Sequence, residues 1–414
     1  MANTFAPVEV GDLLGDVHII DCDGHFTEPS DLWQRRAPAS VKDRLPVLHT
    51  EGTETFWVFE GEMWTGIGGN TIAKGRQKVL GTLTLPFEEI DESSSNVKER
   101  LSLMDEMGLY AQIIYPNALG FASNALFGID DIEFRDLLSS MYNDYFVDLQ
   151  TESGGRLLPQ AVLPVWDMTR TVAELARMHE AGIRGFTITD KPQLVGLPDL
   201  DDAYFAPMWS LGNEIGAVFN FHIGSGGIRG VSPNANMRNV TADNSEMFWN
   251  SFGPQRRLAI LATQAYMSNV RIITNLCMSG LFDRYPNVKV VSAESGIGWV
   301  PFILEAMEYQ VDQMVTTPAE LGLQQRRPTE YFHDHIYVTT WFERSSMKLL
   351  DEVGVDNVLI ETDIPHPTCL YPGARAHFSD VMAQLDAGTR KRILQDNAAE
   401  LYRIAVPGEG SNLA

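Results

Sequence analysis

The chain has 414 residues, 44% of them hydrophobic and 10% aromatic, which is enough to build a large buried core. Its 55 acidic residues against 31 basic ones give a formal net charge of -24, which argues against nucleic-acid and anionic-membrane partners because both would be repelled. The three cysteines lack CxxC spacing, and neither a signal peptide nor a membrane-spanning run is visible, so no disulfide framework is expected and a cytoplasmic protein is predicted.

Eight short apolar runs, most of them rich in Val and Ile, are predicted to form buried parallel strands. They cover residues 17–23, 111–115, 161–165, 184–189, 217–222, 288–293, 336–340 and 357–362. Helical patterns lie between most of these runs, among them residues 172–181, 255–267 and 390–403. This alternation favours an α/β fold, a (β/α)8 TIM barrel, over an open doubly wound sheet. Because such barrels run long as one domain, a single domain over residues 1–414 is expected.

Two segments are much longer than ordinary connections between strands and helices. Residues 26–95 separate the first two strands, include a possible small hairpin around Gly61, and are expected to act as a lid or cap. Residues 223–253 follow the fifth strand and are rich in Gly, Ser and Asn. In a (β/α)8 barrel both segments leave the carboxyl ends of strands, where catalytic loops gather. We therefore expect them to wall the active site, with a surface embellishment as the alternative.

The first predicted strand ends in Asp21, Asp23 and His25, which are two residues apart and are expected to share one face, with Cys22 pointing away. Asp23 and His25 together suit a divalent cation that accepts oxygen and imidazole ligands. A hydrogen-bonded structural pair at the strand end is an equally simple explanation.

Two further strands end in side chains of the same kinds. His222 closes the fifth strand and Asp363 follows the eighth. A lone His is more often a core residue, and a lone Asp is often a helix cap, although Pro365 and Pro367 weaken the cap alternative. A carboxylate after a buried apolar run is unfavourable unless it is paired or binds metal. Together, the strand ends predict one divalent cation held by Asp23, His25, His222 and Asp363.

This constellation resembles that of the amidohydrolase superfamily, specifically its amidohydrolase-2 branch, which includes aminocarboxymuconate-semialdehyde and resorcylate decarboxylases. The similarity runs from about Asp21 to Ile404 and rests on four segments: DCDGHFTEPSDLW, LFDRYPNVKVVSAESGIGWVPFILEAMEY, ETDIPHP and RILQDNAAELYRI. It implies a distorted (β/α)8 barrel with one catalytic metal ion, usually zinc or manganese. It also implies a homodimer or homotetramer.

Two positions depart from the better-known members of this branch. Asp23 stands where many have His or Glu, and the additional carboxylate favours manganese or another oxygen-tolerant metal. Glu294 stands where the decarboxylases commonly have a catalytic His. Glu294 could act as an acid, act as a base on metal-bound water, or hydrogen-bond a metal-binding His, and these alternatives stay open. With Glu294 on the sixth strand and Lys191 just past the fourth, a mononuclear site is expected.

Five other residues are candidates for substrate binding or positioning. His366 is expected to orient substrate or Asp363, or to have a structural role in the Pro-rich turn. Arg229 and Arg238, in the loop after the fifth strand, could clamp a substrate carboxylate or could be ordinary solvated arginines. Asn117 could reach substrate or form a turn, and Trp299 could line an apolar pocket or pack in the core.

The leading hypothesis is hydrolysis of a small organic acid, amide, lactone or activated C–C bond, in which Asp363 takes a proton from metal-bound water and Glu294 or His366 assists the leaving group. The alternative is non-oxidative decarboxylation of an aromatic or enoic acid, in which a protein acid protonates the carbon that loses carbon dioxide. A non-catalytic barrel that binds metal or a small ligand is the third hypothesis.

Overall fold

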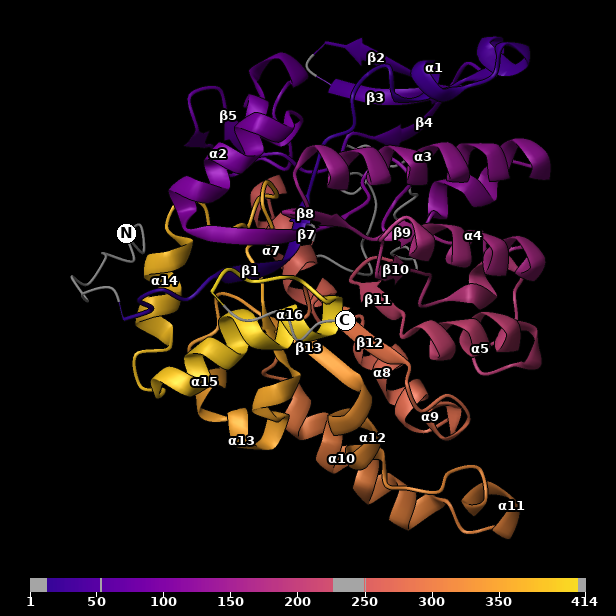
Figure 1. Cartoon of the computed structure of the whole chain (residues 1–414), viewed down its shortest axis with the longest axis vertical. Helices are drawn as coiled ribbons and strands as arrows, with labels where there is room; N and C mark the ends of the chain where they lie inside the picture. Colours follow the sequence, from indigo (N-terminus) through magenta and orange to yellow (C-terminus); the bar gives the residue numbers. More distant parts are fainter. Residues whose placement is uncertain (1–12, 53, 226–248, 250, 409–414) are drawn as a thin grey trace.

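The computed structural model describes residues 13–52, 54–225, 249 and 251–408, and its centre is a sheet of parallel strands (Figure 1). The hydrogen-bonded order is β8-β7-β1-β14-β13-β12-β11-β10-β9, and every neighbouring pair is parallel. The strands are β1 (Ile19–His25), β7 (Leu109–Tyr115), β8 (Leu157–Pro159), β9 (Ala161–Val162), β10 (Gly185–Thr187), β11 (Val218–His222), β12 (Lys289–Ala293), β13 (Ile336–Thr340) and β14 (Val358–Ile360).

The sheet closes into a barrel at Gln160. On one side of this residue β8 pairs with β7, and on the other side β9 pairs with β10. The backbone N–H of Gln160 donates to the carbonyl of Ile114 in β7 over 2.9 Å. Because only Gln160 separates β8 from β9, the two are halves of one barrel strand, and the predicted (β/α)8 TIM barrel is confirmed.

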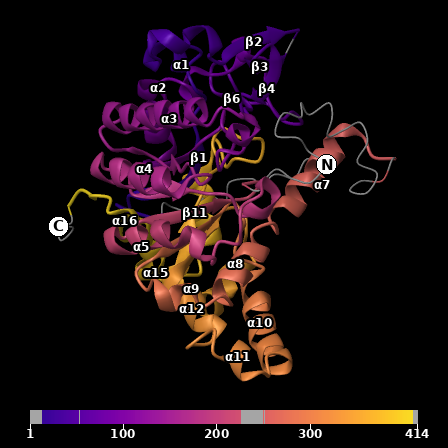
Figure 2. The same cartoon turned by 90° about the vertical axis from the view of Figure 1, so that its right-hand side faces the viewer.

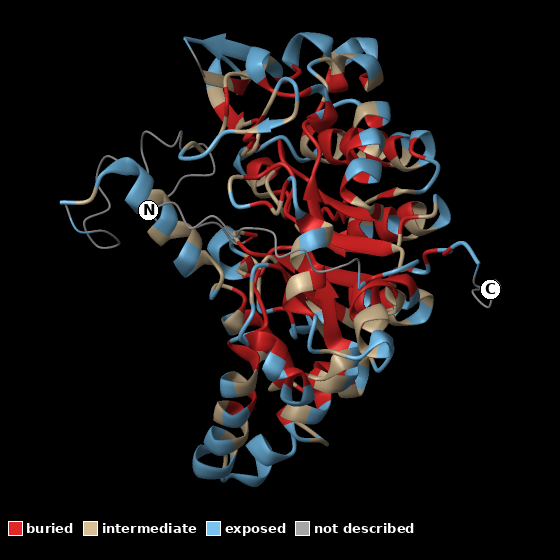
Figure 3. Cartoon of the chain, turned by 90° about the vertical axis from the view of Figure 1, so that its left-hand side faces the viewer, coloured by how far each residue is buried: buried red, intermediate tan, exposed pale blue. Residues whose placement is uncertain are grey.

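Helices surround the barrel, and their buried faces point toward the sheet (Figure 3). The α-helices outside residues 26–95 are α2 (Val97–Met107), α3 (Ile132–Glu152), α4 (Met168–Glu180), α5 (Ala206–Ile215), α7 (Pro254–Ala265), α8 (Val270–Cys277), α9 (Leu281–Arg284), α10 (Val300–Met314), α11 (Pro318–Leu321), α12 (Pro328–His335), α13 (Leu350–Val353), α14 (Ala374–Val381), α15 (Ala387–Lys391) and α16 (Asn397–Tyr402). Short turns of helix are η4 (Asn124–Gly128), η5 (Pro192–Val195), η6 (Ala203–Phe205), η7 (Ser346–Lys348), η8 (Val355–Asn357) and η9 (Arg392–Asp396). None of the helices in the described ranges is both long and apolar enough to cross a bilayer.

Local capping explains where the predicted helices differ from the observed ones. The helix expected at residues 172–181 is α4, and it begins earlier because the Asp167 side chain accepts a hydrogen bond from the backbone N–H of Arg170. The helix expected at residues 390–403 is divided into α15, η9 and α16, because η9 winds as a wider π-helical turn.

The barrel interior is filled by apolar side chains from five strands. Ile20 and Cys22 of β1 pack with side chains of β7, β11, β12 and β14, and Tyr402 of α16 joins the same cluster. Side chains from so many strands can meet only inside a closed barrel. Cys22 therefore points inward, and its predicted outward orientation is wrong.

Asp21 was expected to share the face of Asp23 and His25, and this prediction is also wrong. The pairing of β1 with β7 shifts register between Asp21 and Gly24, which breaks the simple alternation of side chains. Asp21 instead accepts hydrogen bonds from Gln112 Nε2 at 2.7 Å and from the backbone N–H of Thr362 at 2.8 Å. It is a buried anchor between strands rather than part of the predicted metal site.

Residues 26–95 form a separate layer of small elements at one end of the molecule, next to α3 (Figures 1 and 2). They contain α1 (Leu32–Arg36), η1 (Ala39–Arg44), β2 (Val47–Glu51), β3 (Glu54–Phe59), β4 (Glu62–Gly66), β5 (Ile72–Ala73), β6 (Gln77–Lys78), η2 (Phe87–Glu89) and η3 (Glu92–Ser94). β2, β3 and β4 form an antiparallel sheet, and the predicted hairpin around Gly61 is the β3–β4 turn. Glu60 and Gly61 both have left-handed backbone conformations there, which suits a tight turn.

Candidate metal centre

The four side chains predicted to hold a metal converge at the carboxyl ends of barrel strands. Asp23 and His25 come from β1, His222 ends β11, and Asp363 follows β14. The Nε2 atom of His25 lies 3.5 Å from Asp23 Oδ1 and 3.6 Å from Asp363 Oδ1. The Nε2 atom of His222 lies 3.2 Å from Asp23 Oδ2. All four residues are fully buried, so they enclose one small polar point.

Five atoms that face this point have no hydrogen-bond partner among the described residues. They are Asp23 Oδ1, Asp23 Oδ2, His25 Nε2, His222 Nε2 and Asp363 Oδ1, the last of which lies 2.9 Å from His366 Nδ1. Leaving one buried polar atom unpaired already costs about 1–3 kcal/mol, and buried charge without a partner costs more. Five such atoms in one place therefore match the donor set of a cation better than they match a structural hydrogen-bond network.

His222 is held in the form that binds metal. Its Nδ1 atom lies 2.8 Å from the carbonyl oxygen of Ile223, so Nδ1 carries the proton and Nε2 presents its lone pair to Asp23. Burial lowers the pKa of His222 to about 4, and burial also lowers the pKa of His25 well below its ordinary value. Both imidazoles are therefore neutral near pH 7, as metal ligands must be.

The carboxylates around the point need positive charge. Burial raises the pKa of Asp23 well above its ordinary value, and the nearby carboxylates of Asp363 and Asp21 raise it further. Arg100 is fully buried, but its guanidinium donates to the carbonyl of His25 and to Gln112 rather than to these carboxylates. A divalent cation would supply the charge that the nearby side chains do not.

The distances fit a coordination sphere. Metal–ligand bonds of about 2.1 Å place neighbouring ligand atoms about 3.0 Å apart in octahedral geometry and about 3.4 Å apart in tetrahedral geometry. The distances from the Nε2 atoms of His25 and His222 to carboxylate oxygens of Asp23 and Asp363 are 3.2, 3.5 and 3.6 Å. The residues present therefore fit one divalent metal ion, with oxygen and imidazole ligands that suit zinc or manganese.

Two residues of the site have backbone conformations that side chains rarely adopt. Glu294, directly after β12, has φ 56°, and Asp363 has φ 58°. The backbone N–H of Glu294 is held by Thr339 Oγ1 at 3.0 Å and by Glu361 Oε2 at 2.9 Å. The backbone N–H of Asp363 donates to the carbonyl of Asp23 over 2.9 Å. Strain of this kind persists where surrounding contacts enforce it, which is common in functional sites.

His366 lies against the cluster. Its Nδ1 atom is 2.9 Å from Asp363 Oδ1, and its ring stacks on His25 with centroids 3.7 Å apart. Its Nε2 atom has no hydrogen-bond partner among the described residues. The ring of Phe121, which was not predicted, lies 4.0 Å from the His222 ring and 5.1 Å from the His25 ring. His366 and Phe121 thus supply one polar and one apolar edge beside the four predicted ligands.

The segment 26–95 contacts the loop that carries Asp363 and His366. The backbone N–H of Thr71 donates to the carbonyl of Pro365 over 3.0 Å, and its hydroxyl donates to the carbonyl of His366 over 3.1 Å. At Gly69 a Cβ atom would lie 3.2 Å from the His366 ring, so this glycine allows a close approach. The segment therefore borders the site.

Two predicted substrate-binding residues have structural contacts. The backbone N–H of Asn117 donates to the buried carboxylate of Glu28, and its side-chain amide donates to the carbonyl of Phe26. The indole N–H of Trp299 donates to the carbonyl of Ser295 over 3.0 Å, and only 8% of the residue is exposed. Substrate binding by Asn117 or Trp299 stays a prediction.

Two other expectations concern cations near the fifth and fourth strands. Arg229 and Arg238 lie outside the described residues, so their predicted clamp on a substrate carboxylate stays a prediction. Lys191 Nζ lies 3.8 Å from Asp190 Oδ2, and the mononuclear site stays a prediction.

The sequence reasoning missed several residues around the cluster. Glu361 is fully buried beside Glu294, and its pKa is raised well above the ordinary value by burial and then by Asp23. It follows the same buried apolar run that drew attention to Asp363, so the same argument could have found it. Thr368 donates to Asp363 Oδ2 over 3.3 Å and interacts with the phenol of Tyr266. These contacts come from loops and had no signal in the sequence.

Comparison with known proteins gives a consistent result. The amidohydrolase family model matches residues 20–404. A gamma-resorcylate decarboxylase from Polaromonas sp. is 25% identical over 318 residues, which cover 74% of this chain and 86% of that protein. An amidohydrolase from Mycobacterium avium subsp. paratuberculosis has a similar fold, with a TM-score of 0.67 and 20% identity over 94% of this chain and 99% of that chain.

A third comparison bears on the metal. The crystal structure of a dihydroxybenzoic acid decarboxylase from Polaromonas sp., with bound manganese and the inhibitor 2-nitroresorcinol, has a TM-score of 0.57 and 18% identity over 94% of this chain and 97% of that chain. In this chain, the described residues include the buried His and Asp cluster that could hold a metal ion. With the family model matching nearly its whole length, the chain belongs to the amidohydrolase family and is a metal-dependent enzyme of that family.

Proposed function

We propose that this enzyme catalyses the non-oxidative decarboxylation of a small aromatic or enoic carboxylic acid. The observation that carries the proposal is the buried set of unpaired acceptors from Asp23, His25, His222 and Asp363, in a chain whose relatives include resorcylate and dihydroxybenzoic acid decarboxylases. A cation in that set gives an anionic substrate a place to bind on a protein whose net charge is -24.

The bound metal would attract the substrate carboxylate and a neighbouring oxygen and would stabilise charge that develops there. The remaining step is a proton transfer: the bond between the ring carbon and the carboxylate breaks, its electron pair stays on the carbon, and that carbon takes a proton. We assign the proton delivery to Asp363 and His366, because their Oδ1 and Nδ1 atoms lie only 2.9 Å apart. The ring of Phe121 offers an apolar surface beside them.

Hydrolysis was the leading hypothesis from the sequence, and it is now the second candidate. It would use the same residues, with Asp363 as the base for a metal-bound water. The curated relatives support hydrolysis less than decarboxylation. These relatives, at 21 to 25% identity, are named decarboxylases. The non-catalytic alternative has no observation in its favour.

We also propose that residues 26–95 act as the lid or cap and help to select the substrate. The contacts of Thr71 and Gly69 with the loop of Pro365 and His366 support this role. Residues 1–414 are proposed to form one domain. Assembly into a homodimer or homotetramer and a cytoplasmic location stay predictions.

The test is a reaction of manganese-loaded enzyme with hydroxybenzoates and enoic acids in water enriched in oxygen-18. Decarboxylation releases carbon dioxide and adds no labelled oxygen to the organic product, whereas hydrolysis adds one labelled oxygen. In deuterated water the decarboxylated carbon is expected to gain one deuterium. The variant His222→Ala, treated identically, is the control for metal-dependent turnover. Labelled oxygen in the organic product without carbon dioxide would contradict decarboxylation and favour hydrolysis.

A further inference from the structure

Glu294 is a fifth polar side chain at the metal centre whose role is not yet assigned. Its Oε2 atom lies 3.5 Å from His222 Nε2, on a side chain that is only 12% exposed. One carboxylate oxygen from each of Glu294, Asp23 and Asp363 can be chosen so that all three lie within 4.8 Å of one another. The same limit joins Asp23, His25 and His222, and also His25, Asp363 and His366, so Glu294 lies as close to predicted ligands as they lie to one another.

When Glu294 is ionised, its carboxylate oxygen and His222 Nε2 would repel each other without a cation. The proton of His222 is on Nδ1, which is bound to the carbonyl of Ile223, so Nε2 presents a lone pair. A carboxylate oxygen of Glu294 also presents a lone pair, and no described residue donates a hydrogen bond to that carboxylate in the structure. A metal ion bound by both atoms would convert this repulsive contact into two favourable bonds.

The backbone around Glu294 fixes where its carboxylate can reach. Thr339 and Glu361 hold its backbone N–H in the left-handed conformation. The backbone N–H groups of Ile297 and Gly298, three and four residues after Glu294, donate hydrogen bonds to the carboxylate of Glu343, which secures the rest of the turn. The distance of 3.5 Å from His222 therefore comes from a well-anchored loop and falls among the 3.2 to 3.6 Å separations of the other ligands.

We propose that Glu294 is itself a metal ligand, which gives the centre two imidazoles and three carboxylates. This inference rests on the metal centre of the proposed function but does not depend on the substrate or on decarboxylation. A set of five ligands that includes three carboxylates is harder and more negative than a set of four ligands that includes two carboxylates. Carboxylate oxygens suit manganese, whereas imidazole nitrogens suit zinc. Glu294 thus tunes the centre toward manganese.

The experiment measures metal binding to metal-stripped protein by calorimetry, first with Mn2+ and then with Zn2+. Glu294→Gln keeps the size of the side chain but removes its charge. We expect it to bind Mn2+ at least about 10-fold more weakly, since even residues outside the first ligand sphere change affinity by about 10–100-fold. Zn2+ binding is expected to weaken less, so that the preference for Mn2+ over Zn2+ falls. Glu294→His should move the preference further toward Zn2+.

A spectroscopic measurement separates ligation from a change in local charge. In cobalt-substituted protein, loss of one ligand alters the visible absorption bands, because their energies and intensities depend on coordination number. Glu361→Gln is the matched control: it removes the charge of a buried carboxyl group next to Glu294, its amide oxygen can still accept the hydrogen bond from the Glu294 backbone N–H, and Glu361 is not in the ligand cluster. The control is expected to leave the cobalt spectrum unchanged, while Glu294→Gln changes it. Far-UV circular dichroism checks that each variant folds, and Glu294→Asp, which keeps a carboxylate, should retain part of the Mn2+ preference.

The outcomes distinguish this inference from the proposed function. An unchanged Mn2+ affinity and cobalt spectrum in Glu294→Gln would overturn ligation by Glu294. An equal loss of affinity in Glu294→Gln and Glu361→Gln, with both spectra unchanged, would also overturn it and leave only an electrostatic effect. If wild-type enzyme binds Mn2+ as expected but releases no carbon dioxide, decarboxylation fails and the metal inference stands. If Glu294→Gln keeps the spectrum but loses carbon dioxide release, the inference fails and decarboxylation stands.

Discussion

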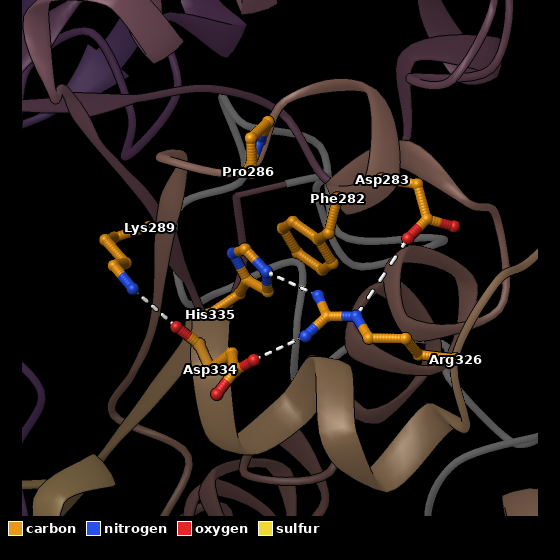
Figure 4. A pocket seen from close by; sticks show the side chains of 7 residues that line it. All are labelled: Phe282, Asp283, Pro286, Lys289, Arg326, Asp334 and His335. Carbon is orange, nitrogen blue, oxygen red and sulfur yellow. Dashed lines mark hydrogen bonds and ion pairs between the residues drawn. The ribbon is translucent and has the colours of Figure 1, made fainter.

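The two ends of the barrel contain similar residues in opposite arrangements. At the carboxyl ends of the strands His222 presents Nε2 to carboxylate oxygens, and all of these atoms are acceptors. At the amino ends His335 is also buried, and its Nδ1 atom lies 2.9 Å from the carbonyl of Val288. Its Nε2 atom, however, receives a hydrogen bond from Arg326 over 3.2 Å (Figure 4). One histidine thus lacks a donor, and the other has one.

The amino end also contains a cavity of roughly 400 Å³. It is lined by Phe282, Asp283, Pro286, Lys289, Arg326, Asp334 and His335. Its charged groups pair with one another: Arg326 contacts Asp334 and Asp283, and Lys289 donates to the carbonyl of Asp334 (Figure 4). A cavity whose polar groups are already satisfied has little affinity left for a ligand. In this molecule unpaired convergent acceptors identify the functional end, and cavity size does not.

The largest expected effect comes from removing a ligand at the carboxyl end. Asp363→Asn should lower kcat about 10²–10⁴-fold, the usual contribution of a positioned acid or base, because the amide neither carries the proton nor binds metal as a carboxylate does. His222→Ala should lose bound metal as well. Metal content by mass spectrometry and turnover on the same preparations check both variants. Full activity and full metal content in Asp363→Asn would remove Asp363 from both roles.

The contrast also predicts how metal binding depends on pH. Asp23 has a raised pKa, so protons compete with metal for it as pH falls, and Mn2+ affinity should drop by at least about 10-fold between pH 7.5 and pH 5.5. The pKa of Asp21 is shifted in the same direction as that of Asp23, because burial raises it from 3.8 to about 6. Its contribution to stability is present below pH 3.8 and is lost as pH rises through about 6, a change of about 3 kcal/mol.

His222 acts in the opposite direction. Burial lowers its pKa from 6.5 to about 4. Its contribution to the free energy of unfolding is therefore present above pH 6.5 and is lost as pH falls through about 4. The buried carboxyl groups whose pKa is raised outnumber the two histidines whose pKa is lowered, His25 and His222. Metal-free protein should therefore resist heat better at pH 6 than at pH 8. Added Mn2+ should raise the melting temperature more at pH 8 than at pH 6. Calorimetric melting curves with and without Mn2+ test this, and an equal increment at both pH values would contradict it.

Much of this contrast could be predicted from the sequence, and the limits have physical causes. The barrel and the convergence of Asp23, His25, His222 and Asp363 follow from apolar runs that end in polar residues, because parallel strands all present their carboxyl ends at one rim. The orientation of Asp21 and Cys22 could not be predicted, since the register shift in β1 has no local signal. His335 could be assigned to the far end from its position just before a strand, but its partner Arg326 lies on another loop.

A smaller effect on turnover is expected from removing the hydrogen bond that Thr368 donates to Asp363. Thr368 donates to Asp363 Oδ2 over 3.3 Å, and Tyr266 interacts with Thr368. Replacing Thr368 by Val removes the contact with Tyr266 and the hydrogen bond to Asp363. The hydrogen bond to Asp363 is worth about 1 kcal/mol, so kcat should fall roughly 5-fold while Mn2+ affinity stays nearly constant. Thr368→Ser, which keeps the hydroxyl, is the control and should retain most of the activity. Equal losses in Thr368→Val and Thr368→Ser would point to packing rather than to the hydrogen bond.

The smallest functional effect is expected at the amino end. Arg326→Ala leaves His335 Nε2 without its donor and removes a largely solvent-accessible pairing with Asp334, whose side chain is 59% exposed. The first change should lower the free energy of unfolding by about 1 kcal/mol, and the second should contribute little because exposed ion pairs are weak. Urea unfolding measures the loss, while Mn2+ affinity and turnover should equal those of wild type, because the paired charges of this cavity have no part in binding metal. A change in Mn2+ affinity would mean that the two ends are coupled, and the separation between a satisfied structural cavity and an unsatisfied functional cluster would no longer hold.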